Sequence, residues 1–261
     1  MPAAPSSMTD RVVAILDIFE GSAKALTIGQ ISVRTGLPRS SAHRILQQLV
    51  SARWVEHRDD GYALGLRMFE IGSLVVHHGR ITDVARPFMQ QLCGRTGHVV
   101  HLAVLDKRDV VYLEKVGGTF ASSLPSRIGG RLPAHCTGVG KALLAYSPRA
   151  VVDQYLKAGL RRRTNASIAT PARMQAVLMN IRDVGYSTER DEAVPGVGCV
   201  AAPIFDLDSA VAAISICGPR DRVRADDFKC QVMETAAEIS RSLPATVARI
   251  QPRERRSLAR L

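Results

Sequence analysis

The sequence predicts an α+β protein of two domains, in which a winged helix-turn-helix is joined by a linker helix to an antiparallel sheet flanked by helices. Three observations predict this architecture. Two short helical patterns near the N-terminus meet at a glycine and a proline, extended apolar runs come in two pairs after residue 97, and helical patterns separate those pairs. With 261 residues, of which 46% are apolar, the chain is long enough to form two cores.

Residues 26–52 carry the helix-turn-helix pattern. Thr27 and Gln30 have the spacing of a capping box, so a helix should begin near residue 28. Gly36 can adopt the positive φ that ends this helix, and Pro38 suits the first turn of the next one. Apolar residues at helical spacing should form the buried side of the second helix: Ala42, Ile45, Leu46 and Leu49. The sequence therefore predicts two helices joined by a tight turn.

The outward side of the second helix has hydrogen-bond donors and no carboxylate. Indeed no Asp or Glu occurs between residues 26 and 55, which matters because carboxylates would repel a phosphate backbone. A hairpin follows, since an Asp59-Asp60-Gly61 turn separates two short apolar runs and completes a winged helix. We predict DNA contacts from Thr27, Arg34, Pro38, Arg39, Ser40, Ser41, His43, Arg44 and Arg58. The alternative is a solvated helical hairpin with no role in DNA binding.

The net charge is consistent with a polyanionic partner without proving one. The formal charge is +11, but residues 1–80 hold nine Arg and Lys against seven Asp and Glu, so basicity near the N-terminus is local to the helix-turn-helix. Much of the remaining charge lies in residues 161–163 and in the tail, which we interpret as solvated segments.

Other helices should precede and follow the winged helix. A polar lead at residues 1–8 should be disordered, and an apolar helix should run from about Asp10 to Gly21. Residues 66–76 form a helix apolar enough either to face a partner chain or to cover the core of its own domain. After an interruption at Gly79, a linker helix at residues 82–95 should have Pro87 in or near its first turns.

The second domain should open with a hairpin at residues 99–113. A loop at residues 117–131, with a short strand near 126–128, is long enough to suggest that it serves a site. Three helices are expected at residues 138–146, 148–159 and 171–184, the last capped by Thr170 and stopped by Gly185. A second hairpin at residues 199–217 and a helix from about residue 225 complete the pattern. We place the domains at 9–78 (winged helix), 79–96 (linker), 97–250 (second domain) and 251–261 (basic tail).

Composition excludes several classes of protein. No apolar run reaches the roughly 18 to 20 residues of a membrane span, and the start lacks the layout of a signal peptide, so we expect a cytoplasmic protein with no membrane partner. Five cysteines without C-x-x-C spacing predict reduced thiols rather than disulfides or a zinc site. The histidines also lack metal-ligand spacing, so we predict no metal and no cofactor.

Two motifs resemble catalytic sites and fail on inspection. Gly138-x-Gly140-Lys141 is part of a phosphate-loop pattern, but His135 stands where that loop needs glycine and Ala142 replaces the magnesium-binding hydroxyl. His135 and Cys136 are adjacent, and adjacent side chains rarely point at each other, so we predict a structural role for both. The sequence therefore predicts no enzyme.

Three separate stretches resemble the IclR family of bacterial transcriptional regulators: residues 36–44 (GLPRSSAHR), 132–145 (LPAHCTGVGKALLA) and 196–203 (GVGCVAAP). Their order and spacing are similar to the family's, and the resemblance covers nearly the whole chain. It implies an N-terminal winged helix, a GAF-like effector domain, and self-association to a homodimer or, as a dimer of dimers, a homotetramer.

The resemblance also implies a pocket for a small organic acid. The matching positions are the backbone of Gly138 and Val139 and the side chains of Glu189, Cys199, Ser215 and Cys217. A helix beginning at Gly138 would present unpaired amides to a carboxylate, and its two glycines would let a ligand approach. This chain departs from the family at Cys217, where a hydroxyl is usual, and at Glu189, where aspartate is commoner.

We therefore predict a regulator whose binding to double-stranded operator DNA is controlled by a small organic acid. The alternative is a regulator that senses oxidants through Cys199 or Cys217. A cysteine with apolar neighbours in a strand tends to be inert, which favours the first hypothesis.

Overall fold

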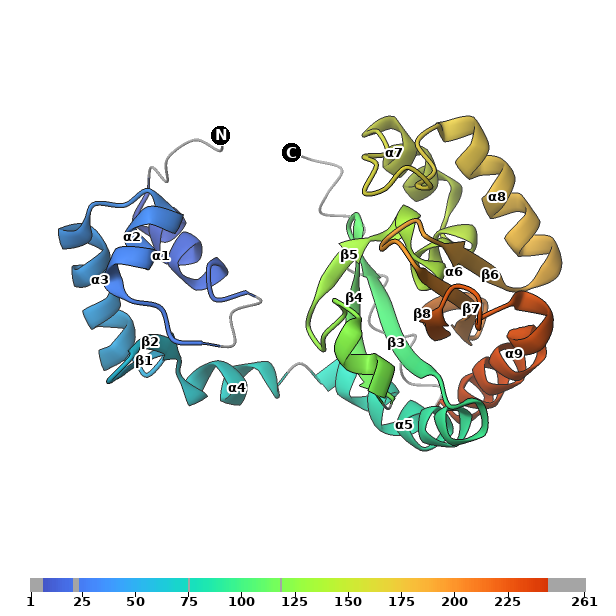
Figure 1. Ribbon diagram of the computed structural model, residues 1–261, viewed down its shortest axis with the longest axis horizontal. Helices are drawn as coiled ribbons and strands as arrows, with labels where there is room; N and C mark the ends of the chain where they lie inside the picture. The colour runs from blue at the N-terminus through green and yellow to red at the C-terminus, as the bar shows by residue number, and fades with distance from the viewer. Residues whose placement is uncertain (1–6, 21–23, 75, 118, 244–261) are drawn as a thin grey trace. The chain divides into compact units, whose positions relative to one another are not determined.

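The computed structural model describes residues 7–20, 24–74, 76–117 and 119–243 (Figure 1). The chain divides into two compact units, residues 1–76 and 77–261. Residues 1–6, Gly21 and the predicted basic tail lie outside the described residues. The first helix, predicted to run to Gly21, instead ends at Asp17, where Ile18 caps it and a turn follows. In the described part of the chain, no helix has both the length and the apolar character needed to cross a bilayer.

The N-terminal unit contains three helices, a hairpin and a fourth helix, and they follow one another as predicted for a winged helix. The elements are α1 (Met8–Asp17), α2 (Ile28–Thr35), α3 (Arg39–Ser51), β1 (Val55–Arg58), β2 (Gly61–Leu64) and α4 (Leu66–Gly72). Ile15 of α1, Ile31 of α2 and Leu46 of α3 are fully buried together in its core. The capping box of Thr27 and Gln30 is confirmed, as is the left-handed backbone at Gly36.

The wing is held to the start of α2 by backbone contacts. Leu26 and Tyr62 exchange two backbone hydrogen bonds of 2.8 and 2.9 Å. Gly61, which has a φ of +134°, lies so close that a Cβ atom there would be 2.6 Å from the Leu26 carbonyl oxygen. Glycine is therefore required at this turn both for its backbone angle and for the close approach.

The second unit is built on a six-stranded antiparallel sheet. Its strands are β3 (Val99–Asp106), β4 (Asp109–Val116), β5 (Arg131–Pro133), β6 (Ser187–Arg190), β7 (Val197–Asp206) and β8 (Ser209–Pro219), in the order β5-β4-β3-β8-β7-β6. Its α-helices are α5 (Val76–Thr96), α6 (Gly138–Ala145), α7 (Arg149–Lys157), α8 (Pro171–Val184) and α9 (Ala225–Ser242). Two short 3₁₀ helices, η1 (Thr119–Ser123) and η2 (Ala134–Cys136), lie in the connection from β4 to α6.

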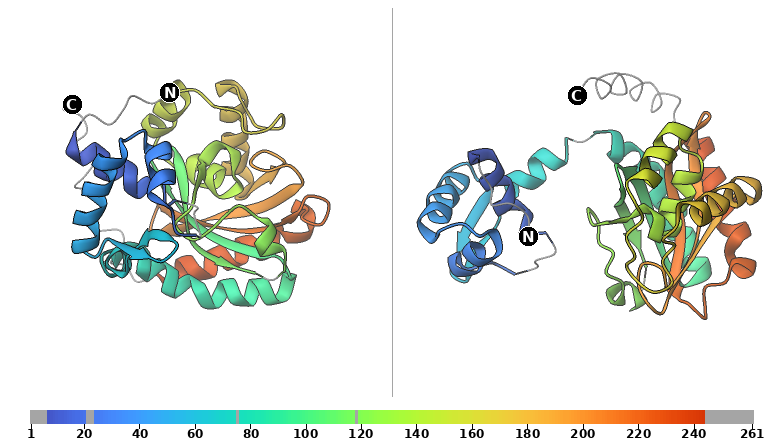
Figure 2. Two further views of the ribbon diagram at one scale, coloured as in Figure 1. Left: turned by 60° about the vertical axis from the view of Figure 1, so that its left-hand side comes forward. Right: turned by 90° about the horizontal axis from the view of Figure 1, so that it is seen from above.

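Helices cover both faces of this sheet (Figures 1 and 2). Helices α5 and α9 pack on one face, where Met89, Ile214 and Ile239 belong to one buried cluster. Helices α6, α7 and α8 lie on the other, where Val139, Leu144 and other apolar residues form a second cluster. The predicted α+β fold, an antiparallel sheet flanked by helices, is confirmed.

The structure corrects several predicted boundaries in the N-terminal half. The first helix begins at Met8, inside the predicted disordered lead, because the Ser7 hydroxyl and the Asp10 carboxylate form a capping box. The helix predicted at residues 66–76 ends at Gly72, and a new helix, α5, starts at Val76. Gly79 does not interrupt α5, since glycine inside a helix costs only about 1 kcal/mol. As a result Pro87 lies in the interior of α5 rather than in its first turns.

Two further corrections concern strands. The short strand predicted at residues 126–128 is instead β5, at Arg131–Pro133, where it pairs with β4. Strand β6 was not predicted, because Ser187–Arg190 alternates buried and exposed residues that are all polar. In addition, the Thr170 side chain makes no capping hydrogen bond to α8, which begins with Pro171 in its first turn. Of these corrections, strand β6 matters most for function, because it carries Glu189.

Candidate functional site

The first candidate surface is the outward side of α3. The predicted buried residues of this helix, Ala42, Ile45, Leu46 and Leu49, are all buried. Consequently Arg39, Ser40, His43 and Arg44 are exposed, and Ser41 is half-buried beside them. This surface has no carboxylate, as the sequence predicts, and it could lie against a polyanion. Its role in DNA binding remains a prediction.

The other predicted DNA contacts differ in how free they are to bind. Arg34 and Pro38 are exposed next to α3. Thr27 is exposed, but its hydroxyl already accepts the Gln30 amide at 3.3 Å and caps α2. In the wing, the Arg58 guanidinium forms an ion pair with Glu56, so a phosphate would have to compete with this carboxylate.

The second candidate site is a cavity between the sheet and the N-terminus of α6. All six residues predicted to bind the effector line it: Gly138, Val139, Glu189, Cys199, Ser215 and Cys217. Its volume, traced by the centre of a water molecule, is about 40 Å³. Strand register explains the convergence, because Glu189 is opposite Cys199, and Cys199 is opposite Cys217, on three neighbouring strands. Opposite residues in an antiparallel sheet project from the same face.

The N-terminus of α6 supplies hydrogen-bond donors to this cavity. The Thr137 hydroxyl accepts the Gly140 amide at 3.1 Å. The amides of Gly138 and Val139 have no acceptor among the described residues, as expected for the first turn of a helix. Both residues line the cavity, so these two amides and the positive end of the helix dipole are available to an anion.

The two glycines of α6 have a different role from the one predicted. A Cβ atom at Gly138 would be 2.8 Å from Cys199 Sγ, and one at Gly140 would be 2.2 Å from the Ala134 carbonyl oxygen. The space beside each glycine is therefore filled by protein. These residues allow α6 to pack closely on β7 and on η2, while the amide of Gly138 stays at the wall of the cavity.

Glu189 lies in the wall of the cavity, and its side chain holds the segment that follows β6. The carboxylate accepts hydrogen bonds from the amides of Glu192 (2.6 Å) and Ala193 (3.2 Å). Burial raises the pKa of Glu189 to about 7, although these amide hydrogen bonds favour the charged form. Because Ala193 and Val194 also line the cavity, Glu189 fixes a segment of the cavity wall.

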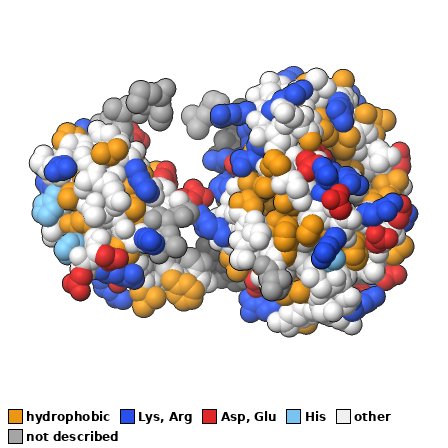
Figure 3. Space-filling view, viewed as in Figure 1, with side chains coloured by type: hydrophobic (Ala, Val, Ile, Leu, Met, Phe, Trp, Pro, Cys, Tyr) orange, Lys and Arg blue, Asp and Glu red, His pale blue; other side chains and the backbone are white. Residues whose placement is uncertain are grey.

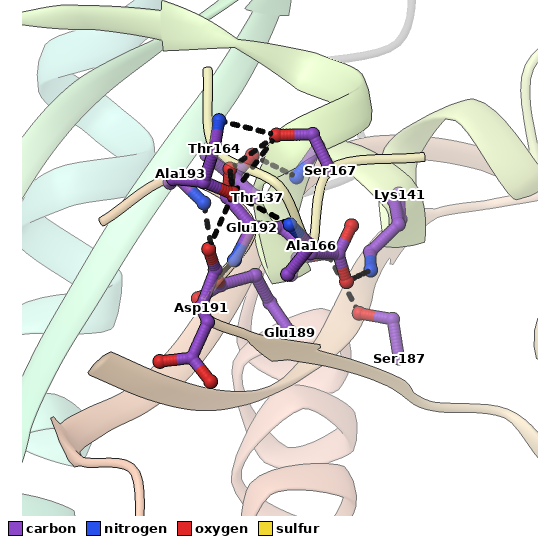
Figure 4. Close-up of polar contacts among 12 residues, drawn as sticks. Thr137, Lys141, Thr164, Ala166, Ser167, Ser187, Glu189, Asp191, Glu192 and Ala193 are labelled. Atoms are coloured by element: carbon purple, nitrogen blue, oxygen red, sulfur yellow. Dashed lines mark hydrogen bonds and ion pairs between the residues drawn. The ribbon is translucent and has the colours of Figure 1, made fainter. Parts of the chain in front are cut away.

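A polar network stands behind this segment (Figure 4). Lys141 of α6, only 2% exposed, forms an ion pair with Glu192, whose second carboxylate oxygen is buried without a partner among the described residues. The Ser167 hydroxyl donates to the Glu192 carbonyl at 2.7 Å, and the Thr164 hydroxyl donates to the Asp191 carbonyl at 2.6 Å. The segment after β6 is thus held by Lys141 of α6 and by Thr164 and Ser167 of the loop between α7 and α8. In the sequence, Lys141 stood out only as part of a phosphate-loop pattern that is incomplete. In the structure its ammonium pairs with the buried Glu192 carboxylate.

Cys199 and Cys217 lie side by side in the sheet. They are directly opposite on β7 and β8, and both are buried. The contact with Cys199, together with burial, raises the pKa of the Cys217 thiol. A Cys217 thiol with a raised pKa ionises poorly, so it is a weak nucleophile near neutral pH.

The His135–Cys136 pair is not arranged for catalysis. Both ring nitrogens of His135 are occupied, since Nδ1 is 2.9 Å from the Tyr155 hydroxyl and Nε2 is 3.0 Å from the Arg161 carbonyl oxygen. Burial raises the pKa of the Cys136 thiol. These contacts join η2 to α7 and to the loop that follows it.

Four polar residues of the cavity were missed as site residues: His101, Tyr112, Ser126 and Thr137. His101 is the one polar residue in the apolar run 99–105 and was considered only as a metal ligand. A buried polar side chain in an otherwise apolar strand was the available signal. Ser126 lies in the loop that was expected to serve a site, but its position there could not be predicted without the strand register.

The chain matches two family descriptions. Residues 73–241 match "Bacterial transcriptional regulator IclR C-terminal", and residues 9–59 match "IclR helix-turn-helix domain". Among curated proteins, it is 34% identical to the HTH-type transcriptional regulator XynR of Escherichia coli over 90% of this chain and 96% of that protein. It is 35% identical to the HTH-type transcriptional repressor AllR of Klebsiella pneumoniae over 90% of this chain and 89% of that one.

Solved structures show the same fold. An IclR homolog from Microbacterium hydrocarbonoxydans, complexed with 4-hydroxybenzoate, has a TM-score of 0.82 and 29% identity over 91% of this chain and 99% of its own. The Thermotoga maritima IclR has a TM-score of 0.74 and 29% identity over 90% of this chain and 98% of its own. Both similarities extend over the winged helix and the domain that contains the cavity.

Proposed function

The chain belongs to the IclR family of bacterial transcriptional regulators, with a DNA-binding helix-turn-helix and an effector-binding C-terminal domain, and we propose that its effector is a small organic acid. The observation that carries this proposal is the pair of unpaired amides, of Gly138 and Val139, at the wall of a buried cavity. A carboxylate there would accept hydrogen bonds from both amides and lie at the positive end of the α6 dipole.

The remaining cavity wall suits the body of such an acid. The Ser215 side chain, 1% exposed, points to the same cavity, while apolar residues such as Leu132 and Val197 surround the space. A benzene ring needs a cavity of roughly 150 Å³. Since the free volume is about 40 Å³, a ring-containing acid must push covering side chains such as Leu124 and Val194 outward. The complex of the Microbacterium protein with 4-hydroxybenzoate makes aromatic acids the first to test.

Calorimetry on the full-length protein tests the proposal with benzoate, 4-hydroxybenzoate, pyruvate and glyoxylate as probes. A hydrogen bond to a charged ligand contributes roughly 1.5 to 3 kcal/mol, so Ser215→Ala should weaken binding of the best probe at least about tenfold. Ser209→Ala, an exposed serine in the same strand, is the matched control. An unchanged dissociation constant for Ser215→Ala, with a probe that still alters DNA binding, would place the effector elsewhere.

For the DNA-binding side we propose a symmetric dimer. Leu66, Phe69 and Leu74, each at least 67% exposed, give the α4 region an apolar surface, visible at the lower edge of the N-terminal unit in Figure 3. Burying this surface in a partner would remove apolar area from water. A two-fold dimer would place one α3 helix in each of two successive major grooves, about 34 Å apart, on a near-palindromic operator. Sedimentation of Phe69→Glu against wild type tests this dimer, which the charged variant should dissociate.

One observation supports a second candidate function. Because Cys199 and Cys217 are directly opposite, a mild oxidant such as diamide could accept the two thiol hydrogens and leave a disulfide. We favour the organic acid, since burial and the contact with Cys199 raise the pKa of the Cys217 thiol and so disfavour its thiolate form. Thiol counting and DNA binding after diamide treatment, on wild type and on Cys217→Ser, distinguish the two functions.

A further inference from the structure

We propose that His101 and Ser126 form a second polar contact in the effector cavity, and that they select acids carrying a hydroxyl group at the end opposite the carboxylate. This inference rests on the proposed function, because it takes the carboxylate site at α6 as its starting point. It concerns a different part of the cavity wall, contributed by β3 and by the segment after η1.

Strand register places the two contacts at opposite ends of the cavity. His101 of β3 is opposite Ser215 of β8, which is opposite Ala201 of β7, which is opposite Ser187 of β6. Three strand spacings of about 4.8 Å therefore separate the backbones of His101 and Ser187 by about 14 Å. The Ser187 hydroxyl donates to the Gly138 carbonyl at 2.6 Å, and Gly138 packs against Cys199 of β7, so the N-terminus of α6 lies over β6 and β7, across β8 from His101.

His101 and Ser126 are held in place as a pair. His101 Nε2 is 2.8 Å from Ser126 Oγ, and the imidazole packs against the Tyr112 ring with centroids 5.0 Å apart. The Ser126 carbonyl accepts a hydrogen bond from Lys115 Nζ at 2.5 Å, which ties this segment to β4. Both side chains are nearly inaccessible to solvent, at 3% and 9% exposed.

The chemistry of the pair matches a hydroxyl better than a second carboxylate. Burial, and then the charge of Lys115, lower the pKa of His101 to about 3, so its ring is neutral at physiological pH. A neutral imidazole and a serine hydroxyl can each donate one hydrogen bond and accept another, as a ligand hydroxyl can. The nearby ammonium of Lys115 is already bonded to the carbonyls of Ala121 and Ser126. A second carboxylate at this end would therefore lack an available cation.

The wall between the two polar ends is largely apolar. Leu124, Leu132, Val139 and Val197 contribute to it, and the Tyr112 ring lies beside His101. A ligand that matches all three parts has a carboxylate, an apolar body and a hydroxyl at the far end. Hydroxy-substituted aromatic acids have this arrangement.

Matched pairs of probes test the inference by calorimetry on the full-length protein. The pairs are benzoate with 4-hydroxybenzoate, benzoate with 3-hydroxybenzoate, and phenylacetate with 4-hydroxyphenylacetate. In at least one pair the hydroxylated acid should bind wild type about tenfold more tightly, equivalent to about 1.4 kcal/mol. Ser126→Ala should remove this preference without changing the affinity for the acid that lacks the hydroxyl. Ser209→Ala should leave both affinities unchanged.

His101 variants give a second measurement. His101→Gln keeps a donor and an acceptor near Ser126 and should retain part of the preference, whereas His101→Phe should lose it; thermal unfolding verifies that each variant is folded. If Ser126→Ala weakens neither acid or weakens both equally, while Ser215→Ala still weakens both, the inference is overturned and the carboxylate site stands. If no probe binds wild type, the organic-acid proposal and this inference both fail.

Discussion

The two units of the protein place their functional side chains in opposite environments. On α3 the candidate DNA contacts are exposed, and the apolar residues beneath them form the core of a small unit. In the effector domain, Glu189, Ser215 and His101 are each no more than 3% exposed and lie inside the fold. The first site is a surface carried by a folded unit, whereas the second is part of the packing itself.

This difference has a consequence for mutations. Removing an exposed arginine from α3 takes nothing from the core, so DNA affinity should change while stability does not. Changing a buried polar residue of the effector domain alters both ligand binding and the free energy of unfolding. The only tryptophan, Trp54, lies in the N-terminal unit, so its fluorescence reports on that unit, while circular dichroism reports mainly on the larger one.

The largest expected effect is at the buried ion pair. Lys141→Met leaves the Glu192 carboxylate buried and unpaired, which should destabilise the effector domain by about 3 to 5 kcal/mol. Urea unfolding should show an earlier transition in circular dichroism and an unchanged one in Trp54 fluorescence. The exposed pair of Arg149 and Asp153 is a matched control, and Arg149→Met should cost at most about 1 kcal/mol. Adding Glu192→Leu to Lys141→Met should recover most of the lost free energy of unfolding. Equal stability of the single variants Lys141→Met and Arg149→Met would contradict the prediction.

Next is the pH dependence caused by Glu189. Because its pKa rises from 4.5 to about 7 on folding, the folded state holds a proton that the unfolded state loses, and stability falls as pH increases from about 4.5 to 7. Glu189→Gln should lack this component, so it should gain about 2 to 3 kcal/mol relative to wild type between pH 4.5 and pH 8. Denaturation midpoints across this range measure the effect. Parallel profiles for the two proteins would show that folding does not raise the pKa of Glu189.

On the exposed surface, Arg44→Ala should weaken binding to the operator by roughly 1 to 3 kcal/mol if the side chain contacts a guanine. If it contacts only a phosphate, the affinities for matched and scrambled duplexes should fall equally. Fluorescence anisotropy on both duplexes separates these outcomes, and Trp54 fluorescence should give the same unfolding transition as wild type. Arg173→Ala removes the same charge from an exposed site in the other unit. Wild-type affinity in both Arg39→Ala and Arg44→Ala would exclude α3 as the recognition helix.

The smallest effect should come from the cap of α2. Thr27→Ala removes the hydroxyl that accepts the Gln30 amide, which should destabilise the N-terminal unit by about 1 kcal/mol. The change should appear in Trp54 fluorescence, with no change in effector affinity, and Thr27→Ser should behave like wild type. Equal shifts of both transitions would mean that the two units do not unfold separately, and a shift confined to the circular-dichroism transition would contradict the prediction.

The sequence by itself determined the features that depend on neighbouring residues. The capping box joins residues three positions apart, and the helix stop at Gly36, the wing turn and the buried side of α3 likewise depend on a few adjacent positions. Local hydrogen bonds and helical periodicity are sufficient to specify such features. The resemblance to a family further identified six residues that the fold brings to one cavity.

Only the tertiary structure decided which distant groups meet. His101 and Ser126 are 25 positions apart, and Lys141 and Glu192 are 51 apart. Their contacts depend on strand register and on how closely α6 packs against the sheet. The same packing requires glycine at position 138, where a Cβ atom would be 2.8 Å from Cys199 Sγ. Periodicity in one strand shows which residues share a face, but the partner across the sheet is fixed by burial summed over the whole domain.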